Sequence, residues 1–162
     1  MEKNISISKI DLIVYDFDGV MTNNKVIIDQ YGNESVVVSR SDGMGISEIK
    51  DKGILQIIIS TEKNPVVLKR SEKLKIKCIQ GVKDKKKVLI HFCQKNNISL
   101  GKIIFLGNDL NDESAMSIVG IPICPNDAHP NIKEISKIIL ETKGGDGVCR
   151  ELNELIKNWM EV

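Results

Sequence analysis

Short apolar runs that stop at polar residues, with helical patterns between them, dominate this chain. The first run, residues 10–15, reads Ile-Asp-Leu-Ile-Val-Tyr and ends at Asp16, and comparable runs cover residues 54–59, 103–106 and 121–124. Strands that are buried on both faces have this nearly continuous apolar character. Their alternation with helices predicts an α/β protein with a Rossmann-like, doubly wound and mostly parallel sheet.

Helical patterns lie between and after these strands. We expect helices at residues 42–52, 65–74, 85–96, 112–119, 129–137 and 147–159, and one further short strand at residues 77–79. Gly53 suits the position just past the end of the first helix, where a left-handed backbone is common. Pro65 suits a first helical turn, where no partner is needed for the missing N–H.

Residues 25–38 interrupt the alternation of strands and helices. Two runs rich in β-branched residues, 25–28 and 35–38, flank the turn sequence Asp-Gln-Tyr-Gly-Asn. This pattern predicts a β-hairpin inserted after the first strand. The chain has no internal repeat or Pro/Gly/Ser-rich linker, and its 162 residues with 41% hydrophobic content suit one core. We therefore expect a single domain over residues 1–162.

The composition excludes several classes of partner. The chain has 23 Lys and Arg against 22 Asp and Glu, so no strong overall field attracts nucleic acid or anionic lipid. The four cysteines show no CxxC spacing, and residues 1–9 lack the apolar stretch of a secretory signal, which favours reduced thiols. No apolar run approaches the roughly 20 residues that span a bilayer. The sequence thus predicts a cytoplasmic protein.

Polar and charged residues follow three of the expected strands. The sequences are Asp-Phe-Asp-Gly at residues 16–19, Ser-Thr-Glu-Lys at residues 60–63 and Gly-Asn-Asp-Leu-Asn-Asp at residues 107–112. Ligands of doubly wound sheets bind beyond the carboxyl ends of the strands, so these groups are expected together with Lys85, which opens a helix. A strand-end Asp is also a common turn or N-cap residue, so the argument depends on the whole set. Converging carboxylates with oxygen ligands favour a bound Mg²⁺.

The order of these residues resembles the four motifs of the haloacid dehalogenase superfamily of phosphohydrolases, over nearly the whole chain. The resemblance implies that Asp16 is the nucleophile, which forms an aspartyl phosphate, and that Asp18 is the general acid and base. It further implies that Ser60 hydrogen-bonds the transferring phosphoryl group and that Lys85 neutralises it. Asp112 would hold Lys85 in place. A magnesium-dependent phosphatase is the expected activity.

The fourth motif departs from the family pattern. The family usually has Gly-Asp-Asp, whose first Asp ligates magnesium, whereas this sequence has Asn108 and Asp109 after the glycine. An Asn can donate a carbonyl oxygen to a hard cation but removes a negative charge, so weaker binding is expected unless Asp109 substitutes. The predicted Mg²⁺ ligands are therefore Asp16, Asp18, Asn108 and Asp109.

Other segments resemble one lid-less branch of the superfamily. These are the hairpin, the Ser-Asp-Gly-Met-Gly sequence that starts at Ser41, and the Gly-rich segment 144–151. The branch includes 3-deoxyoctulosonate 8-phosphate phosphatases, 2-keto-3-deoxynononate 9-phosphate phosphatases and the C-terminal domains of some acylneuraminate cytidylyltransferases. It implies no large cap domain, a sugar phosphate as substrate, and a homotetramer in which hairpins assemble and a neighbouring subunit covers the site.

The residues after the second strand bear on the substrate. Octulosonate phosphatases typically show Thr-Gly-Arg there, whereas nononate phosphatases carry Gly-Glu-Lys, which Glu62 and Lys63 resemble more closely. A nine-carbon keto-sugar acid of sialic acid biosynthesis is the resulting expectation. Its carboxylate would meet Arg70 or Lys73 and its hydroxyls Glu62, and Ser41 is a further expected substrate-binding residue.

Two other functions stay open at this point. The domain could be a non-catalytic oligomerisation module associated with an acylneuraminate cytidylyltransferase, with Asn108 as a sign of decay. It could also be a phospho-receiver domain, which combines a similar sheet with an acid cluster and a lysine. Receivers carry the phosphorylated Asp after the third strand, whereas the acid pair of this chain follows the first.

Overall fold

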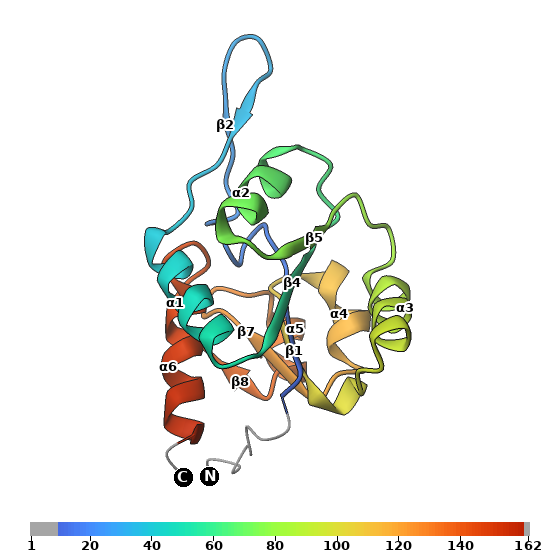
Figure 1. The fold of residues 1–162 in the computed structure, drawn as a ribbon. Helices are drawn as coiled ribbons and strands as arrows, with labels where there is room; N and C mark the ends of the chain where they lie inside the picture. The colour runs from blue at the N-terminus through green and yellow to red at the C-terminus, as the bar shows by residue number, and fades with distance from the viewer. Residues whose placement is uncertain (1–9, 161–162) are drawn as a thin grey trace.

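The computed structural model describes residues 10–160 and is built on a six-stranded parallel sheet in the order β5-β4-β1-β6-β7-β8 (Figure 1). The strands are β1 (Leu12–Tyr15), β4 (Leu55–Ile59), β5 (Lys77–Ile79), β6 (Ile103–Leu106), β7 (Ile121–Cys124) and β8 (Ile138–Ile139). The chain runs outward from β1 to β5 and then returns to β6 on the other side of β1. The loops after β1 and β6 therefore diverge at a switch point, where ligands of such sheets bind.

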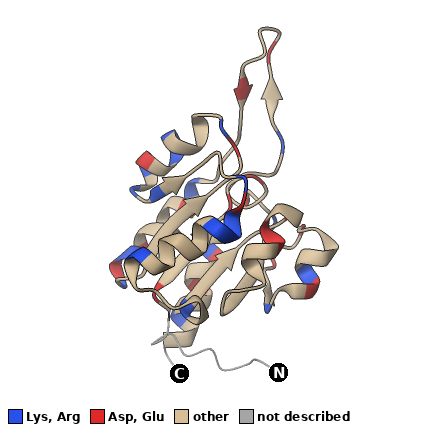
Figure 2. Cartoon of the chain, turned by 90° about the vertical axis from the view of Figure 1, so that its right-hand side faces the viewer, with Lys and Arg blue, Asp and Glu red and all other residues tan. Residues whose placement is uncertain are grey.

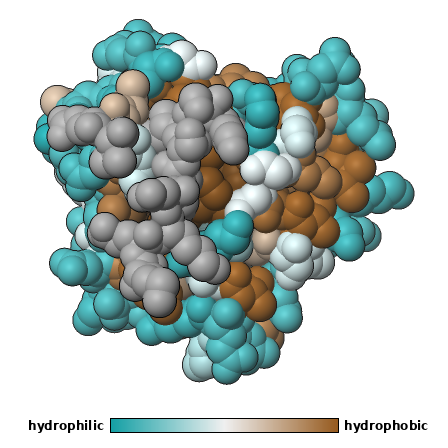
Figure 3. Space-filling model, turned by 90° about the horizontal axis from the view of Figure 1, so that it is seen from below, coloured by the Kyte–Doolittle hydropathy of each residue, from teal (hydrophilic) through white to brown (hydrophobic). Residues whose placement is uncertain are grey.

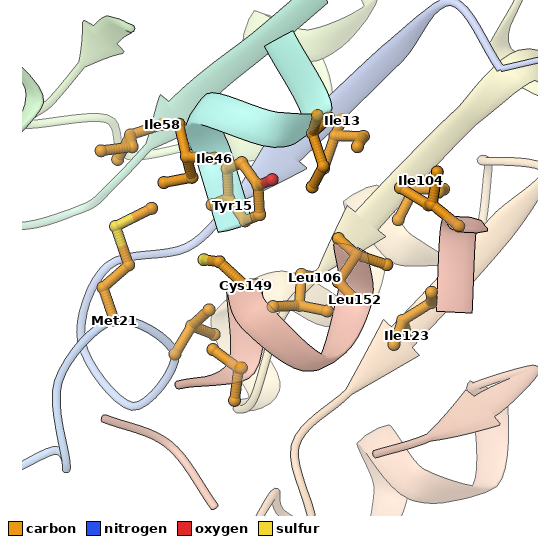
Figure 4. Close-up of a cluster of buried hydrophobic side chains, with 14 of the residues drawn as sticks. Ile13, Tyr15, Met21, Ile46, Ile58, Ile104, Leu106, Ile123, Cys149 and Leu152 are labelled. Carbon is orange, nitrogen blue, oxygen red and sulfur yellow. The ribbon is translucent and has the colours of Figure 1, made fainter. Parts of the chain in front are cut away.

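Helices cover both faces of this sheet. They are α1 (Arg40–Asp51), α2 (Val66–Leu74), α3 (Lys85–Asn96), α4 (Leu110–Met116), α5 (Pro130–Ile135) and α6 (Val148–Met160). Helices α1, α2 and α6 supply buried side chains to one core, and α3, α4 and α5 supply them to the other. Figure 4 shows the first core, in which Tyr15 and Leu106 from the strands lie near Leu152 of α6. With both faces covered, β1 is buried along its whole length, as its apolar sequence predicts.

The expected hairpin is present and projects from the body of the molecule (Figure 1). Its strands β2 (Ile27–Ile28) and β3 (Glu34–Ser35) are antiparallel and shorter than predicted, and a bridge between Thr22 and Val38 closes the base. Asp29 accepts main-chain hydrogen bonds from Tyr31 and Asn33, which fixes the turn. Residues 10–160 contain no cap domain, so the expected fold class is confirmed.

Element boundaries differ from the prediction at a few places. Helix α4 begins at Leu110 and not at residue 112, because Asp109 provides the N-cap. Strand β8 was not predicted, and it exists through its pairing with β7. Gly53 does follow α1 with φ +78, as expected of a residue just past a helix end.

The described part of the chain contains no helix that is both long and apolar enough to cross a membrane. Its cysteines, Cys78, Cys93, Cys124 and Cys149, form no disulfide with one another. Residues 1–9, where the sequence shows no signal stretch, lie outside the described residues, as do residues 161–162.

Seen from below, hydrophilic residues surround the rim of the molecule and apolar ones lie between them (Figure 3).

Candidate active site

A cavity of about 200 Å³ opens at the carboxyl ends of the central strands. It is lined by polar residues of the loops after β1, β4 and β6: Asp16, Asp18, Asn24, Thr61, Asn108, Asp109 and Asn111. In Figure 2, acidic and basic segments lie side by side near this edge of the sheet, below the hairpin. The cavity is therefore at the switch point of the sheet, where the sequence predicts the site.

Lys85 lies between two carboxylates, one of which, Asp16, lines this cavity. Its Nζ atom is 2.7 Å from Asp16 Oδ1 and 2.6 Å from Asp112 Oδ1. All three side chains are buried, with no more than 5% of any of them exposed. The main-chain N–H of Phe17 also donates to Asp16 Oδ1, at 2.7 Å. Two buried carboxylates thus share one ammonium, and one negative charge is left without a partner of opposite sign.

This imbalance appears in the acid–base properties of the group. Burial and the neighbouring Asp112 charge raise the pKa of Asp16 to about 7, although Lys85 opposes the shift. Burial lowers the pKa of the Lys85 ammonium, but the two carboxylates outweigh it, so the pKa of Lys85 is raised. At neutral pH, Asp16 is therefore stabilised either by a bound proton, which removes its charge, or by a nearby cation, which offsets that charge.

Asp112 also organises the loop after β6. Its Oδ2 atom accepts hydrogen bonds from the main-chain N–H groups of Asn108, at 2.9 Å, and Asp109, at 3.3 Å. Asp109 in turn accepts from Leu110 N and caps α4. One carboxylate therefore fixes both the lysine and the loop that carries Asn108.

Asp18 follows two residues after Asp16 and is half-buried at the cavity wall. Burial, and then the negative charge of Glu62, raise the pKa of Asp18. The hydroxyl of Thr22 donates to Asp18 Oδ1 at 3.5 Å. A carboxyl group with a raised pKa beside a second carboxyl group is suited to donate a proton.

Gly19 makes room for the close approach of the two loops. Its backbone has φ +84, and a Cβ atom at this position would collide with the Asn108 side chain. Only glycine combines this conformation with this space. The loops after β1 and β6 can therefore meet over the cavity.

The loop after β4 provides hydroxyl groups at the cavity. Ser60 is buried, and its Oγ accepts from the main-chain N–H of Glu62 at 3.1 Å. Glu62 Oε1 accepts from the N–H groups of Lys63 and Asn64, so the carboxylate is held within its own loop. Thr61, rather than Ser60, is among the cavity-lining residues.

Three lining residues were not among the predicted site residues: Asn24, Thr61 and Asn111. Asn111 Nδ2 donates to Thr61 Oγ1 at 3.4 Å, which joins the loops after β6 and β4. The only sequence signal for Thr61 and Asn111 is their place in the polar segments after two strands. Asn24 lies at the base of the hairpin with φ +63, and no sequence pattern pointed to it.

None of the four predicted substrate-binding residues, Ser41, Glu62, Arg70 and Lys73, is among the residues that line the cavity. Arg70 Nη2 donates to the Ser39 carbonyl at 2.8 Å, and Lys73 is exposed on α2. Ser41 Oγ is 2.6 Å from Ser39 Oγ at the start of α1. The structure therefore does not bring Ser41, Arg70 or Lys73 together with Asp16 within one chain.

Oxygen atoms rather than a cluster of acids mark the place for a cation. Among residues 10–160, no three His, Cys, Asp or Glu side chains are grouped to hold a metal ion. One end of the Asn108 amide, however, lies 3.2 Å from Asp16 Oδ2 and 2.8 Å from the Asp18 carbonyl oxygen. Adjacent ligands of an octahedral Mg²⁺ are about 2.9 Å apart, so with its oxygen at this end the amide has the spacing of a ligand next to each of the two oxygens. With nitrogen there, the amide donates to both oxygens instead.

This site has a buried carboxylate fixed by a lysine, a second carboxyl group two residues later, and oxygens spaced for a hard cation. On a doubly wound sheet, these features are typical of a hydrolase that acts on phosphate esters. The comparison with protein families gives the same class. The chain belongs to the haloacid dehalogenase-like hydrolases, whose family model matches residues 7–152.

Similar proteins include phosphatases of one kind. The 3-deoxy-D-manno-octulosonate 8-phosphate phosphatase of Haemophilus influenzae is 25% identical over 151 residues, which cover 93% of this chain and 84% of the relative. The enzyme of the same name from Yersinia pestis is 28% identical. The match covers 92% of this chain and 80% of the length of that enzyme. These proteins and the family identify the chain as a phosphatase.

Solved structures agree with this assignment. The Moraxella catarrhalis 3-deoxy-D-manno-octulosonate 8-phosphate phosphatase, in complex with magnesium, phosphate and a KDO molecule, has a TM-score of 0.90. It is 30% identical, and the match covers 94% of this chain and 88% of that one. A protein from Streptomyces avermitilis, assigned to the same hydrolase family, has a TM-score of 0.89 and 37% identity over 96% of this chain and 87% of its own.

Proposed function

We propose that this chain, as one catalytic domain, is a Mg²⁺-dependent phosphatase that hydrolyses the phosphate ester of a keto-sugar acid. The preferred substrate is of the nonulosonate 9-phosphate type, with octulosonate 8-phosphate as the alternative. The arrangement of Lys85 between Asp16 and Asp112 is the observation that carries the proposal. A merely structural site would not bury two carboxylates against one lysine beside a polar cavity.

Asp16 would act as the nucleophile. Its Oδ2 atom faces Asn108, whereas its Oδ1 atom is held by Lys85 and the Phe17 N–H, so Oδ1 is the oxygen oriented for attack on phosphorus. As the Asp16–phosphorus bond forms, the bond from phosphorus to the sugar oxygen breaks. Lys85 offsets the negative charge of the phosphoryl group during this step.

Asp18 would transfer the protons. Its raised pKa favours the protonated form, which can give its proton to the departing sugar oxygen. The Asp18 carboxylate then takes a proton from water as the water oxygen attacks the phosphorus of the aspartyl phosphate. Phosphate leaves and the Asp16 carboxylate is restored, so both carboxyl groups return to their initial states.

Magnesium would be held by Asp16, the Asp18 carbonyl and Asn108, with Asp109 nearby on the cavity wall. When bound, the ion neutralises charge on the phosphate oxygens. The Moraxella catarrhalis enzyme, solved with a magnesium ion and a phosphate ion, supports this assignment.

Glu62 would select the substrate. Its negative charge raises the pKa of Asp18, and it lies in the same loop as the cavity-lining Thr61. A carboxylate there repels the substrate carboxylate and accepts hydrogen bonds from hydroxyl groups. We expect the wild type to hydrolyse a nine-carbon 9-phosphate more efficiently than an eight-carbon 8-phosphate. Glu62→Arg should reverse this preference, and an unchanged ratio of kcat/KM values would refute the role of Glu62.

The open cavity would be completed by another subunit of a homotetramer. The hairpin exposes apolar side chains that a single protomer leaves uncovered: Val26, Ile27, Ile28, Tyr31 and Val37. Exposed apolar area of this kind is typical of an assembly surface. Arg70 and Lys73, which lie outside the cavity of their own chain, could then act on a neighbouring site. Ile28→Asp should lower the mass measured by light scattering during gel filtration, with Lys25→Asp as the control.

A phosphate-release screen tests the activity itself. Wild type is assayed on a panel of sugar phosphates with and without Mg²⁺, beside Asp16→Asn. Release that requires both Mg²⁺ and Asp16 would support the proposal. No release by wild type from any substrate, with the tetramer intact, would favour the non-catalytic oligomerisation module.

A further inference from the structure

A second concave surface lies between the edge of the sheet and α3, away from the cavity described above. It is a groove of about 410 Å³, and its floor consists of Ile79 from β5 and Val88 and Phe92 from α3. Val88 and Phe92 are four residues apart, so they form one row along the helix. Pockets with a mainly apolar lining and a few polar groups are typical of binding sites.

Positive charges border this apolar floor on both sides. Lys77 of β5 borders it on the strand side, with its Nζ atom 5.3 Å from the centre of the Phe92 ring. Lys87, His91 and Lys95 border it on the helix side. Figure 2 views the molecule from this side. Among residues 10–160, no carboxylate forms an ion pair with any of these three lysines. The groove therefore carries positive charge that the described part of the chain does not neutralise.

The strand beside the groove has a free edge. β5 is the first strand in the sheet order and pairs only with β4 among the described strands. Such an edge offers main-chain N–H and C=O groups to an added strand. Addition of an extended peptide at a free edge is a common mode of peptide recognition.

The spacing of these basic side chains matches an extended chain. Lys87, His91 and Lys95 are each four residues apart on α3, which places them about 6 Å apart along the helix axis. Alternate residues of an extended strand are about 6.6 Å apart and lie on the same face. A strand added to β5 would therefore present every second side chain to this row.

We propose that this groove binds an acidic segment of a partner protein, in extended conformation, with carboxylates at alternate positions facing α3. The free edge of β5 would supply main-chain hydrogen bonds, and the positive row would select for acidic side chains. Single-stranded nucleic acid also repeats negative charge, but it cannot pair with the main chain of β5. The edge strand therefore favours a peptide.

The proposal is tested with labelled peptides and the full chain. The probe is Asp-Val-Glu-Val-Asp-Val-Glu, and its control has the same composition with all acids placed together. Fluorescence anisotropy at low salt should show tighter binding of the alternating peptide, and hydrogen exchange should show slower exchange of the β5 amides on binding. Equal binding of both peptides, or none at concentrations up to about 1 mM, would overturn the proposal.

Charge reversal locates the binding site. The double variant Lys87→Glu and Lys95→Glu should weaken binding of the alternating peptide on the order of tenfold, since two exposed ion pairs become repulsive. The double variant Lys83→Glu and Lys86→Glu has the same net charge, changes exposed lysines outside the groove, and should weaken binding less than about twofold. Equal effects of the two double variants would refute the assignment to the groove.

Two further measurements test the role of Lys77 and the choice of a peptide over a nucleic acid. Lys77→Met removes a groove ammonium without adding a negative charge and should weaken the same peptide about threefold, with exchange of the β1 amides unchanged as evidence of folding. An oligonucleotide of thymidines is measured at the same salt concentration. If it binds more tightly than the alternating peptide, the groove is a nucleic-acid surface and the peptide proposal is wrong.

Discussion

Replacement of Asp16 by Asn should stabilise the metal-free protein at neutral pH while it removes the proposed nucleophile. Asp16 shares Lys85 with Asp112, and burial together with the Asp112 charge raises the pKa of Asp16 to about 7. The pKa of an Asp in an unfolded chain is about 3.9. The difference corresponds to about 4 kcal/mol in the free energy of unfolding, because each pKa unit is about 1.4 kcal/mol.

The direction of this stability difference follows from proton binding. Between about pH 4 and about pH 7, the folded state keeps the Asp16 proton while the unfolded state has lost it. The stability contribution of protonated Asp16 is therefore fully present below about pH 4 and is lost as the pH rises to 7. Asn cannot ionise, so Asp16→Asn avoids this loss. We expect the variant to match wild type near pH 4 and to exceed it by about 4 kcal/mol near pH 8.

Urea denaturation with a chelator present measures both curves. Asp11→Asn is the matched control, because Asp11 forms an exposed ion pair with Lys102 and its removal should change stability by less than about 0.5 kcal/mol. If Asp16→Asn is less stable than wild type at pH 8, or if the difference between them does not vary with pH, the reasoning on the buried charge is refuted. Excess Mg²⁺ should reduce the difference by stabilising wild type.

Three further changes test the site. Lys85→Met leaves two carboxylates buried without their ammonium. It should lower the free energy of unfolding, measured by urea denaturation, by about 3–5 kcal/mol. Lys86→Met, on the exposed side of the helix, should not lower it. Asn108→Asp restores a charged ligand and should tighten Mg²⁺ binding by about tenfold in calorimetry, and unchanged affinity would exclude Asn108 as a ligand. Glu62→Gln removes a charge that raises the pKa of Asp18, so the alkaline limb of the kcat/KM profile should move to lower pH, and a fixed limb would contradict the role of Asp18 as general acid.

The sheet and the proposed catalytic cluster follow from local sequence features. The strand that ends at Asp16 is recognisable because its residues are apolar and bounded by polar ones, as a strand buried on both faces requires. The position of Lys85 follows from the helix start at Asp84, which caps α3 by accepting from Lys87 N. Parallel strands then bring these groups to one edge without further information.

Features that depend on distant contacts were not predictable in this way. Arg70 donates to the Ser39 carbonyl, a residue 31 positions away, so its place is set by the packing of α2 against α1. Strand β8 has only Ile138 and Ile139, and its pairing with Ile123 and Cys124 of β7 defines it. A helix pattern or a short apolar pair does not encode such contacts, because they arise only when the elements have packed.

The presence of Asn rather than Asp at position 108 can be explained by the charges around it in the metal-free site. An Asp there would place a third carboxylate within 3.2 Å of Asp16 Oδ2 and 2.8 Å of the Asp18 carbonyl, in a group that already has one negative charge in excess. Without a cation, those oxygens would repel one another. The amide can instead turn its nitrogen to both oxygens and hold the loops after β1 and β6 together, and turn its oxygen to a bound ion. Asn108 thus exchanges metal affinity for a stable site in the metal-free chain, which predicts that Asn108→Asp lowers metal-free stability in the same variant that binds Mg²⁺ more tightly.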